Sequence, residues 1–205
     1  FGTWADGVTV YNPRENTYKH FKHNPADPSS LSSNNAWVIF EDSDKNIWIG
    51  TYFGGLDMYD VNTNSFIRYK YSNDVFTKIQ SIHEDKHGVF WIATDGDGLQ
   101  LFDKKTKTFR RVVHTSGQNS LSNDRVCNVF EDRNGNMWIS TMAGLNYYDV
   151  QKKTFTIYTT RDGLPNDVVL GIMEDESGKL WLSTNRGLSR FDAGTKTFKN
   201  FGVAD

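Results

Sequence analysis

The chain has 205 residues, a length that a single all-β domain can take, with 23 basic and 25 acidic residues and a net charge of −2. This balance excludes the strongly basic surface that is typical of nucleic-acid-binding proteins. No apolar run approaches the ~20 residues of a membrane-spanning helix, and one cysteine, Cys127, cannot form an internal disulfide.

Residues 1–21 carry the second half of a unit that recurs four times further along the chain. A Gly-Thr pair, a second Gly, an Asn and an aromatic residue follow one another there at the spacing that residues 50–66 repeat. We therefore expect residues 1–21 to form the two outer strands of a unit whose two inner strands are absent.

The whole unit is marked by a Glu-Asp pair, a Trp seven residues after the Glu, and then Thr, Gly-Leu, Asp and Phe. Between these marks lie runs of four to six β-branched and aromatic residues, bounded by Gly, Asn, Asp or Ser, which predict strands rather than helices. Four strands per unit and a repeat of 43 to 47 residues are typical of β-propeller blades. The marker tryptophans, which we expect in the core, are Trp48, Trp91, Trp138 and Trp181.

The sequence thus predicts an all-β fold with an outer half-blade and four complete four-stranded blades. We expect the half-blade over residues 1–21 and the blades over residues 22–69, 70–112, 113–158 and 159–201. Because the strand at residues 7–11 lacks an inner partner, we expect an open arc of a larger propeller, or one that completes itself against another copy. A closed five-bladed ring with one thinned blade is the alternative.

Spacing within the unit also divides its loops into two groups. The turns between the first and second and between the third and fourth strands keep their length, whereas the other two connections vary. In an up-and-down blade these two groups lie on opposite faces. Because loops carry variation and function while strands keep the frame, we expect binding on the face with the variable connections.

Other motifs favour structural roles. The Asp- and Asn-rich turns resemble calcium loops but lack the bidentate Glu at the twelfth position, and such residues suit tight hairpins. His20 and His23 have no further ligands nearby for zinc. No nucleophile or phosphate-binding loop is recognisable, so we expect no catalytic residue, no metal and no cofactor.

The loops after the second strand differ chemically from blade to blade, which a purely structural role does not require. They combine aromatic rings with Asp, Asn and Arg, a combination that suits carbohydrate, because the C–H faces of sugars pack on rings and hydroxyl groups take polar partners. Solvent-exposed loops or an interdomain contact are the alternative. Trp37, at the entrance to an inner strand, is a candidate as well. The candidate ligand-binding residues are Trp4, Asp6, Trp37, Tyr52, Phe53, Asp95, Asp97, Arg125, Met142, Asn185 and Arg186.

The string from Phe130 to Thr141, followed by Gly144-Leu145, resembles the two-component regulator propeller repeat, and residues 169–184 match it as well. Departures are mild: the copy at residues 74–94 lacks the usual lead-in. The resemblance implies a propeller, commonly of seven blades, in the periplasmic part of an inner-membrane hybrid histidine kinase. It also implies a neighbouring immunoglobulin-like domain and a role in sensing an oligosaccharide.

The leading interpretation is a non-enzymatic periplasmic sensor that recognises an extracellular signal, an oligosaccharide from polysaccharide breakdown. As partners we expect that ligand, and self-association or contact with a neighbouring propeller or immunoglobulin-like domain, without nucleic acid or direct membrane contact. One alternative is a protein-interaction or dimerisation module without a small ligand. Another is a lyase that resembles the streptogramin lyases, which would need a His and a metal-binding carboxylate at the channel.

Overall fold

The computed structural model describes residues 1–71 and 78–202, and within them every regular element except a single helical turn is a strand. The strands form one two-stranded and four four-stranded antiparallel sheets. These sheets are the half-blade and the first to fourth blades. The predicted fold class is therefore confirmed.

The half-blade and the first blade occupy the N-terminal third of the chain. The half-blade consists of β1 (Val8–Asn12) and β2 (Thr17–Phe21). The first blade consists of β3 (Ala36–Glu41), β4 (Ile47–Thr51), β5 (Gly55–Asp60) and β6 (Ser65–Tyr69).

The other three blades follow in chain order. The second has β7 (Ile79–Glu84), β8 (Val89–Thr94), β9 (Leu99–Asp103) and β10 (Thr108–Val112). The third has β11 (Val126–Glu131), β12 (Met137–Thr141), β13 (Gly144–Asp149) and β14 (Thr154–Tyr158). The fourth has β15 (Val169–Glu174), β16 (Leu180–Thr184), β17 (Gly187–Asp192) and β18 (Thr197–Phe201), preceded by the helical turn η1 (Thr160–Asp162).

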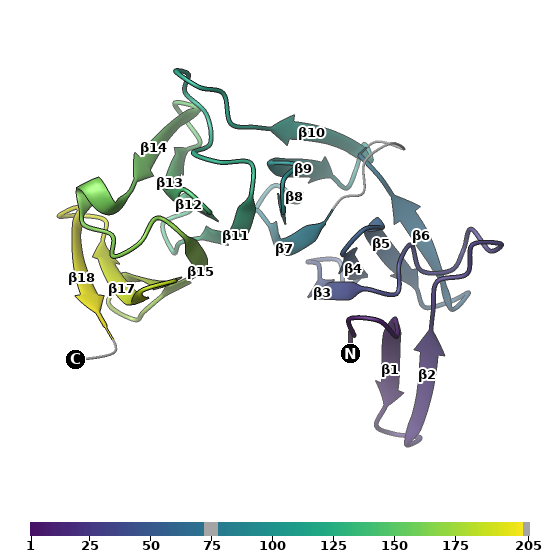
Figure 1. Ribbon diagram of the computed structural model, residues 1–205. Coiled ribbons are helices and arrows are strands. Elements are labelled where there is room, and N and C mark those ends of the chain that lie inside the picture. Colours follow the sequence, from purple (N-terminus) through teal and green to yellow (C-terminus); the bar gives the residue numbers. More distant parts are fainter. Residues whose placement is uncertain (72–77, 203–205) are drawn as a thin grey trace.

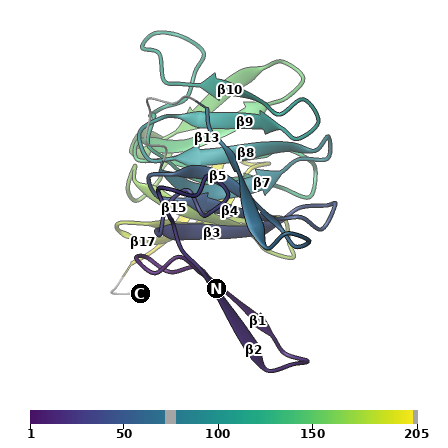
Figure 2. The ribbon, with the colours of Figure 1, turned by 90° about the vertical axis from the view of Figure 1, so that its right-hand side faces the viewer.

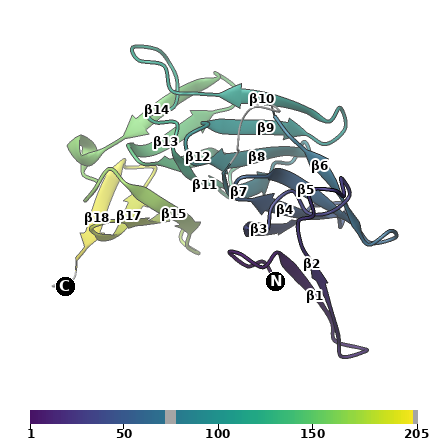
Figure 3. The same ribbon diagram turned by 45° about the vertical axis from the view of Figure 1, so that its right-hand side comes forward.

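The five sheets stand side by side in an arc, with the half-blade at one end and the fourth blade at the other (Figure 1). The turned view keeps the two ends apart (Figure 3). Seen from the side, the hairpin β1–β2 extends away from the stacked blades (Figure 2). The molecule is therefore an open arc and not a closed five-bladed ring.

A carboxylate holds the turn between the first two strands of each blade. In the first blade, the Oδ1 atom of Asp42 accepts hydrogen bonds from the backbone of Asp44 and Asn46, and its Oδ2 atom accepts one of 2.9 Å from the indole of Trp48. The same indole-to-carboxylate bond is 2.9 Å long in the other three blades. This bond explains why Asp and Trp recur six residues apart: the Asp orders the turn and also satisfies the buried indole N–H.

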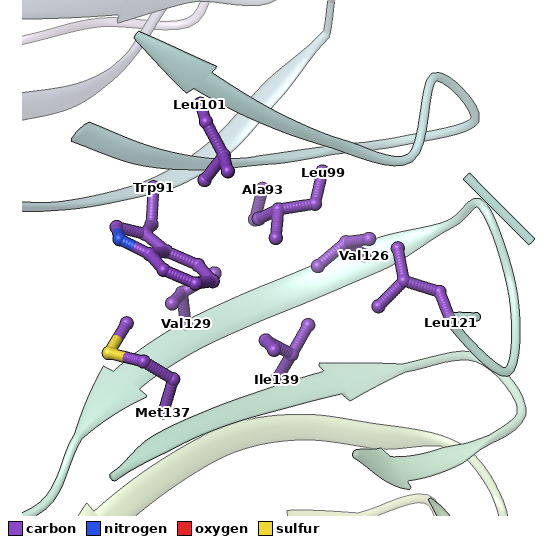
Figure 4. Packing of buried hydrophobic residues seen from close by; sticks show 9 residues of the cluster. All are labelled: Trp91, Ala93, Leu99, Leu101, Leu121, Val126, Val129, Met137 and Ile139. Carbon is purple, nitrogen blue, oxygen red and sulfur yellow. The ribbon is translucent and has the colours of Figure 1, made fainter. Parts of the chain in front are cut away.

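The core lies between blades. Between the second and third blades, Trp91, Leu99 and Leu101 of one sheet meet Val129 and Ile139 of the next (Figure 4). The marker tryptophans are buried in the first three blades, as predicted, and half-buried in the fourth. In the described residues no helix is long and apolar enough to cross a bilayer.

Candidate functional site

The innermost strand of every complete blade contains a bulge at the same position. The register with the second strand skips one residue between Ala36 and Val38, and it skips the equivalent residue in the other three blades. A bulge leaves its extra residue out of the pairing and re-aims the side chain. The four skipped residues are Trp37, Gln80, Cys127 and Leu170.

All four bulge residues line one hollow, which lies on the inner side of the arc and has a volume of about 490 Å³. The loops after the second strands and the start of β11 supply the rest of its wall. Sites of this size suit small ligands, and a largely apolar wall with a few polar groups is their usual make-up. The hollow is lined by Trp4, Trp37, Tyr52, Gln80, Asp95, Arg125, Val126, Cys127, Met142 and Leu170.

One end of the hollow is aromatic. The ring centroid of Trp4 lies 5.6 Å from that of Trp37 and 5.2 Å from that of Tyr52, and the rings of Trp37 and Tyr52 are 6.0 Å apart. Trp4 and Trp37 are 54% and 52% exposed. Because these two indoles are held at one place but remain open to solvent, they form a platform on which a ligand can stack.

The centre of the hollow is polar, and its charges are paired. Asp95 accepts a hydrogen bond of 3.0 Å from the Tyr52 hydroxyl and one of 2.6 Å from Nε of Arg125. Partial burial acts to raise the pKa of Asp95, but these hydrogen bonds and the charge of Arg125 outweigh it and keep the pKa below its ordinary value. Burial and the neighbouring carboxylate raise the pKa of the Tyr52 hydroxyl. Asp95 is thus ionised and Tyr52 neutral at physiological pH.

The other end is aliphatic and sulfur-containing. Cys127 and Met142 are half-buried there, and Leu170 is 48% exposed. Burial raises the pKa of the Cys127 thiol, so that the side chain is neutral and offers only weak hydrogen bonding. The hollow therefore runs from aromatic rings through a polar centre to an apolar wall.

Six of the eleven candidate residues line this hollow: Trp4, Trp37, Tyr52, Asp95, Arg125 and Met142. The other five are not among its lining residues, and their role in binding stays a prediction.

These five lie in several different surroundings. Asp6 forms an ion pair with Lys22, and the backbone oxygen and carboxylate of Asp97 face Arg111. Phe53 contacts the edge of Tyr52, with ring centroids 4.8 Å apart. The remaining two, Asn185 and Arg186, are exposed in the loop of the fourth blade.

Four residues of the wall were missed by sequence reasoning: Gln80, Val126, Cys127 and Leu170. The sequence indicated Trp37 because it is a tryptophan outside the marker series. Its equivalents Gln80, Cys127 and Leu170 have no such distinguishing feature. The signal that could have found three of them is their shared place four residues before the Glu of the Glu-Asp pair, the position that Trp37 holds in its own copy of the repeat.

A second cavity, of about 450 Å³, lies between the second and third blades and includes Asp85, Glu131 and Tyr147 in its wall. It is formed mainly by turns that the repeat keeps constant, so it lacks the blade-to-blade variation seen at the hollow. Among residues 1–71 and 78–202, no three His, Cys, Asp or Glu side chains converge as a metal site would require.

Comparison with known proteins identifies the repeat. The pattern of the family described as "Two component regulator propeller" matches residues 30–53, 73–96, 120–143 and 155–186, about half of the chain. The chain is also 33% identical over 169 residues to a protein named histidine kinase P4 from Formosa agariphila. That match covers 80% of the chain and 12% of the relative, so the chain spans a small part of the relative's length.

Solved structures share the fold. The extracellular domain of a protein named as a hybrid two component system from B. thetaiotaomicron superposes with a TM-score of 0.81 at 24% identity, over 100% of this chain and 26% of that one. Virginiamycin B lyase from Staphylococcus aureus superposes with a TM-score of 0.72 at 11% identity, over 98% and 64% of the two chains. At these identities the likeness is one of fold.

Proposed function

The chain belongs to the two component regulator propeller family, and from this membership we propose that it is a periplasmic sensor region of a two-component signalling protein. Its ligand in this proposal is an oligosaccharide released by the breakdown of a polysaccharide. The names of the histidine kinase relative and of the extracellular domain with the same fold support the setting.

The observation that carries the ligand proposal is the aromatic platform beside a polar pair. A pyranose ring has C–H faces that pack on Trp and Tyr rings and an equatorial belt of hydroxyl groups that need hydrogen-bond partners. Trp4 and Trp37 supply exposed rings, and Arg125, which binds Asp95 through Nε, lies in the wall of the same hollow and has further N–H donors. Aromatic groups with an adjacent polar handle are well suited to such half-polar ligands.

The proposed mechanism is a shift of population. The wall of the hollow is built from the half-blade and all four blades, so a bound ligand contacts several sheets at once. Such a ligand stabilises the arrangement of blades and neighbouring domains in which all of these contacts form together. The equilibrium shifts toward this arrangement by the difference between the ligand's binding free energies for the two arrangements. In this proposal the chain itself performs no reaction, and a kinase elsewhere in the parent protein reads the change.

A protein-interaction module is the second candidate, because the side chains that form the platform are also suited to a partner surface. Trp and Tyr are enriched where partners bind most tightly. Binding of sugar would distinguish the two functions.

The test is calorimetry with a panel of neutral oligosaccharides (xylo-, manno- and gluco-oligosaccharides) on the wild-type chain and on Trp37→Ala. We expect at least one member to bind and Trp37→Ala to weaken it by about tenfold or more, which corresponds to about 1.4 kcal/mol. Trp37 lies outside the strand pairing, so the variant should keep its fold.

Tyr18→Ala is the matched control, because Tyr18 is 59% exposed and stacks on Tyr11 away from the hollow. It should bind as the wild type does. Equal binding by Trp37→Ala would remove the platform from the proposal, and failure of the whole panel to bind would favour the protein-interaction module.

A further inference from the structure

The hollow is not uniform along the arc, and its apolar end is poorly matched to an unsubstituted sugar. Val126, Cys127, Met142 and Leu170 form this end. A sugar hydroxyl placed against them would lose its bonds to water and gain no equivalent partner, which is unfavourable. Building on the proposed sensor function, we propose that the ligand is an uncharged oligosaccharide that carries small acyl substituents, such as O-acetyl groups.

The paired charges argue that the ligand is uncharged. Among the described residues that line the wall, Asp95 and Arg125 are the ionised ones, and they bind each other at 2.6 Å. Lys78 lies outside the wall, with its Nζ atom 5.5 Å from the centre of the Tyr52 ring. The Oδ2 atom of Asp95 is taken by Tyr52. A carboxylate on the ligand would have to share Arg125 with Asp95 at close range, and like charges brought together oppose binding. Uronic acid units are therefore disfavoured.

The arrangement of the wall argues for the acyl group. An O-acetyl ester replaces a hydroxyl donor by a methyl group and a carbonyl acceptor, so no donor is left without a partner. Its methyl group fits against Met142 and Leu170, and its carbonyl can accept from the Arg125 guanidinium or the Gln80 amide at the polar centre. The sugar rings then stack on the aromatic end of the same hollow.

The contact residues of three blades occupy the bulge position of the innermost strand. Gln80, Cys127 and Leu170 hold the position in their blades that Trp37 holds in the first. One structural position therefore supplies the stacking ring, the amide and the apolar contacts, and the order of the blades sets the order of the ligand groups. Gln80, Cys127 and Leu170 are in this proposal the residues that determine specificity for the substituent.

The test uses matched pairs of ligands. Acetylated xylo-oligosaccharides and acetylated manno-oligosaccharides are each compared by calorimetry with the same sample after removal of acetyl groups by mild alkali. We expect the acetylated member of one pair to bind at least tenfold more tightly to the wild-type chain. Oligogalacturonate, the charged probe, should bind more weakly than either.

Two methionine variants separate this inference from a general loss of binding. Met142→Gln puts a polar amide into the apolar end, where it offers a sugar hydroxyl a hydrogen-bond partner and removes the apolar contact for the methyl group. It should bring the acetylated-to-deacetylated affinity ratio close to one. Met173→Gln is the control, because Met173 is 67% exposed and lies outside the wall of the hollow. It should leave the ratio unchanged.

The outcomes are distinguishable. Equal affinity for both members of a pair, with binding still lost in Trp37→Ala, would overturn the acyl proposal and leave the sensor function standing. Tighter binding of oligogalacturonate would overturn the uncharged ligand. If no oligosaccharide binds, the sensor function and the acyl proposal fail together.

Discussion

Asp57 is a buried carboxylate at a place where the third blade has an amide. Its Oδ2 atom accepts hydrogen bonds from the backbone and hydroxyl of Ser32, while its Oδ1 atom has no partner. Asn146 likewise accepts a hydrogen bond from the backbone of Ser122, but its amide nitrogen donates to the Ser122 hydroxyl at 2.9 Å and to the backbone oxygen of Ile139 at 3.1 Å. Burial raises the pKa of Asp57 from 3.8 to about 6, so folding favours the protonated acid, which can donate as the amide does.

The sign of the pH effect follows from this raised pKa. Protonated Asp57 contributes its full stability below pH 3.8, and that contribution is lost as pH rises through about 6. A shift of this size corresponds to about 3 kcal/mol at most. We expect Asp57→Asn to raise the free energy of unfolding at pH 7.5 by about 1–2 kcal/mol and to flatten its decline between pH 4 and pH 7. Urea unfolding of both proteins at pH 4.5 and 7.5 measures this, and a destabilised variant at both values would contradict it.

At the scale of the blade, the sequence predicted what depends on local composition and periodicity. The strands follow from short β-branched runs, and Trp48 and Trp138 are buried at 3% and 2% exposure, as expected. The bulges were not predicted, because a register shift depends on how two strands pair and not on the composition of either strand. Loop residues such as Asp97 and Arg186 were grouped with the site by position, although the direction of their side chains depends on tertiary contacts.

The marker tryptophans give a prediction at this scale. Trp138 lies in the cluster between the third and fourth blades, whereas Trp181 lies in the last blade of the described residues and is half-buried. We expect Trp138→Ala to lower the free energy of unfolding by ~3–5 kcal/mol, the usual effect of emptying a buried aromatic site. Trp181→Ala, which deletes the same atoms and the same indole hydrogen bond, should lower it by clearly less. Equal losses in chemical denaturation would show that packing between blades does not set the difference.

At the scale of the whole molecule, the open arc exposes a blade face that is covered elsewhere. Leu188 of the fourth blade is 47% exposed, whereas its equivalents Leu56, Leu99 and Leu145 are at most 1% exposed. Each of those three packs against the blade that follows it. An apolar face of this kind is an association site.

We therefore expect the isolated chain to self-associate as its concentration rises, and Leu188→Gln to reduce that association. Sedimentation velocity at several concentrations measures both proteins. Ile157→Gln is the control, because Ile157 is 40% exposed but lies on an outer strand. If both variants associate as the wild type does, the end face of the arc is not the contact.

The bulges on the innermost strands have a consequence for how such a protein can change. The residue at each bulge takes no part in the pairing of its sheet, so its replacement leaves the hydrogen-bonded frame of the blade as it was. One blade can exchange a ring for an amide, and the next a thiol for an aliphatic group, independently of each other. A duplicated blade therefore brings with it one position that is free to diversify, and a row of blades becomes a set of separately adjustable contacts around a constant scaffold.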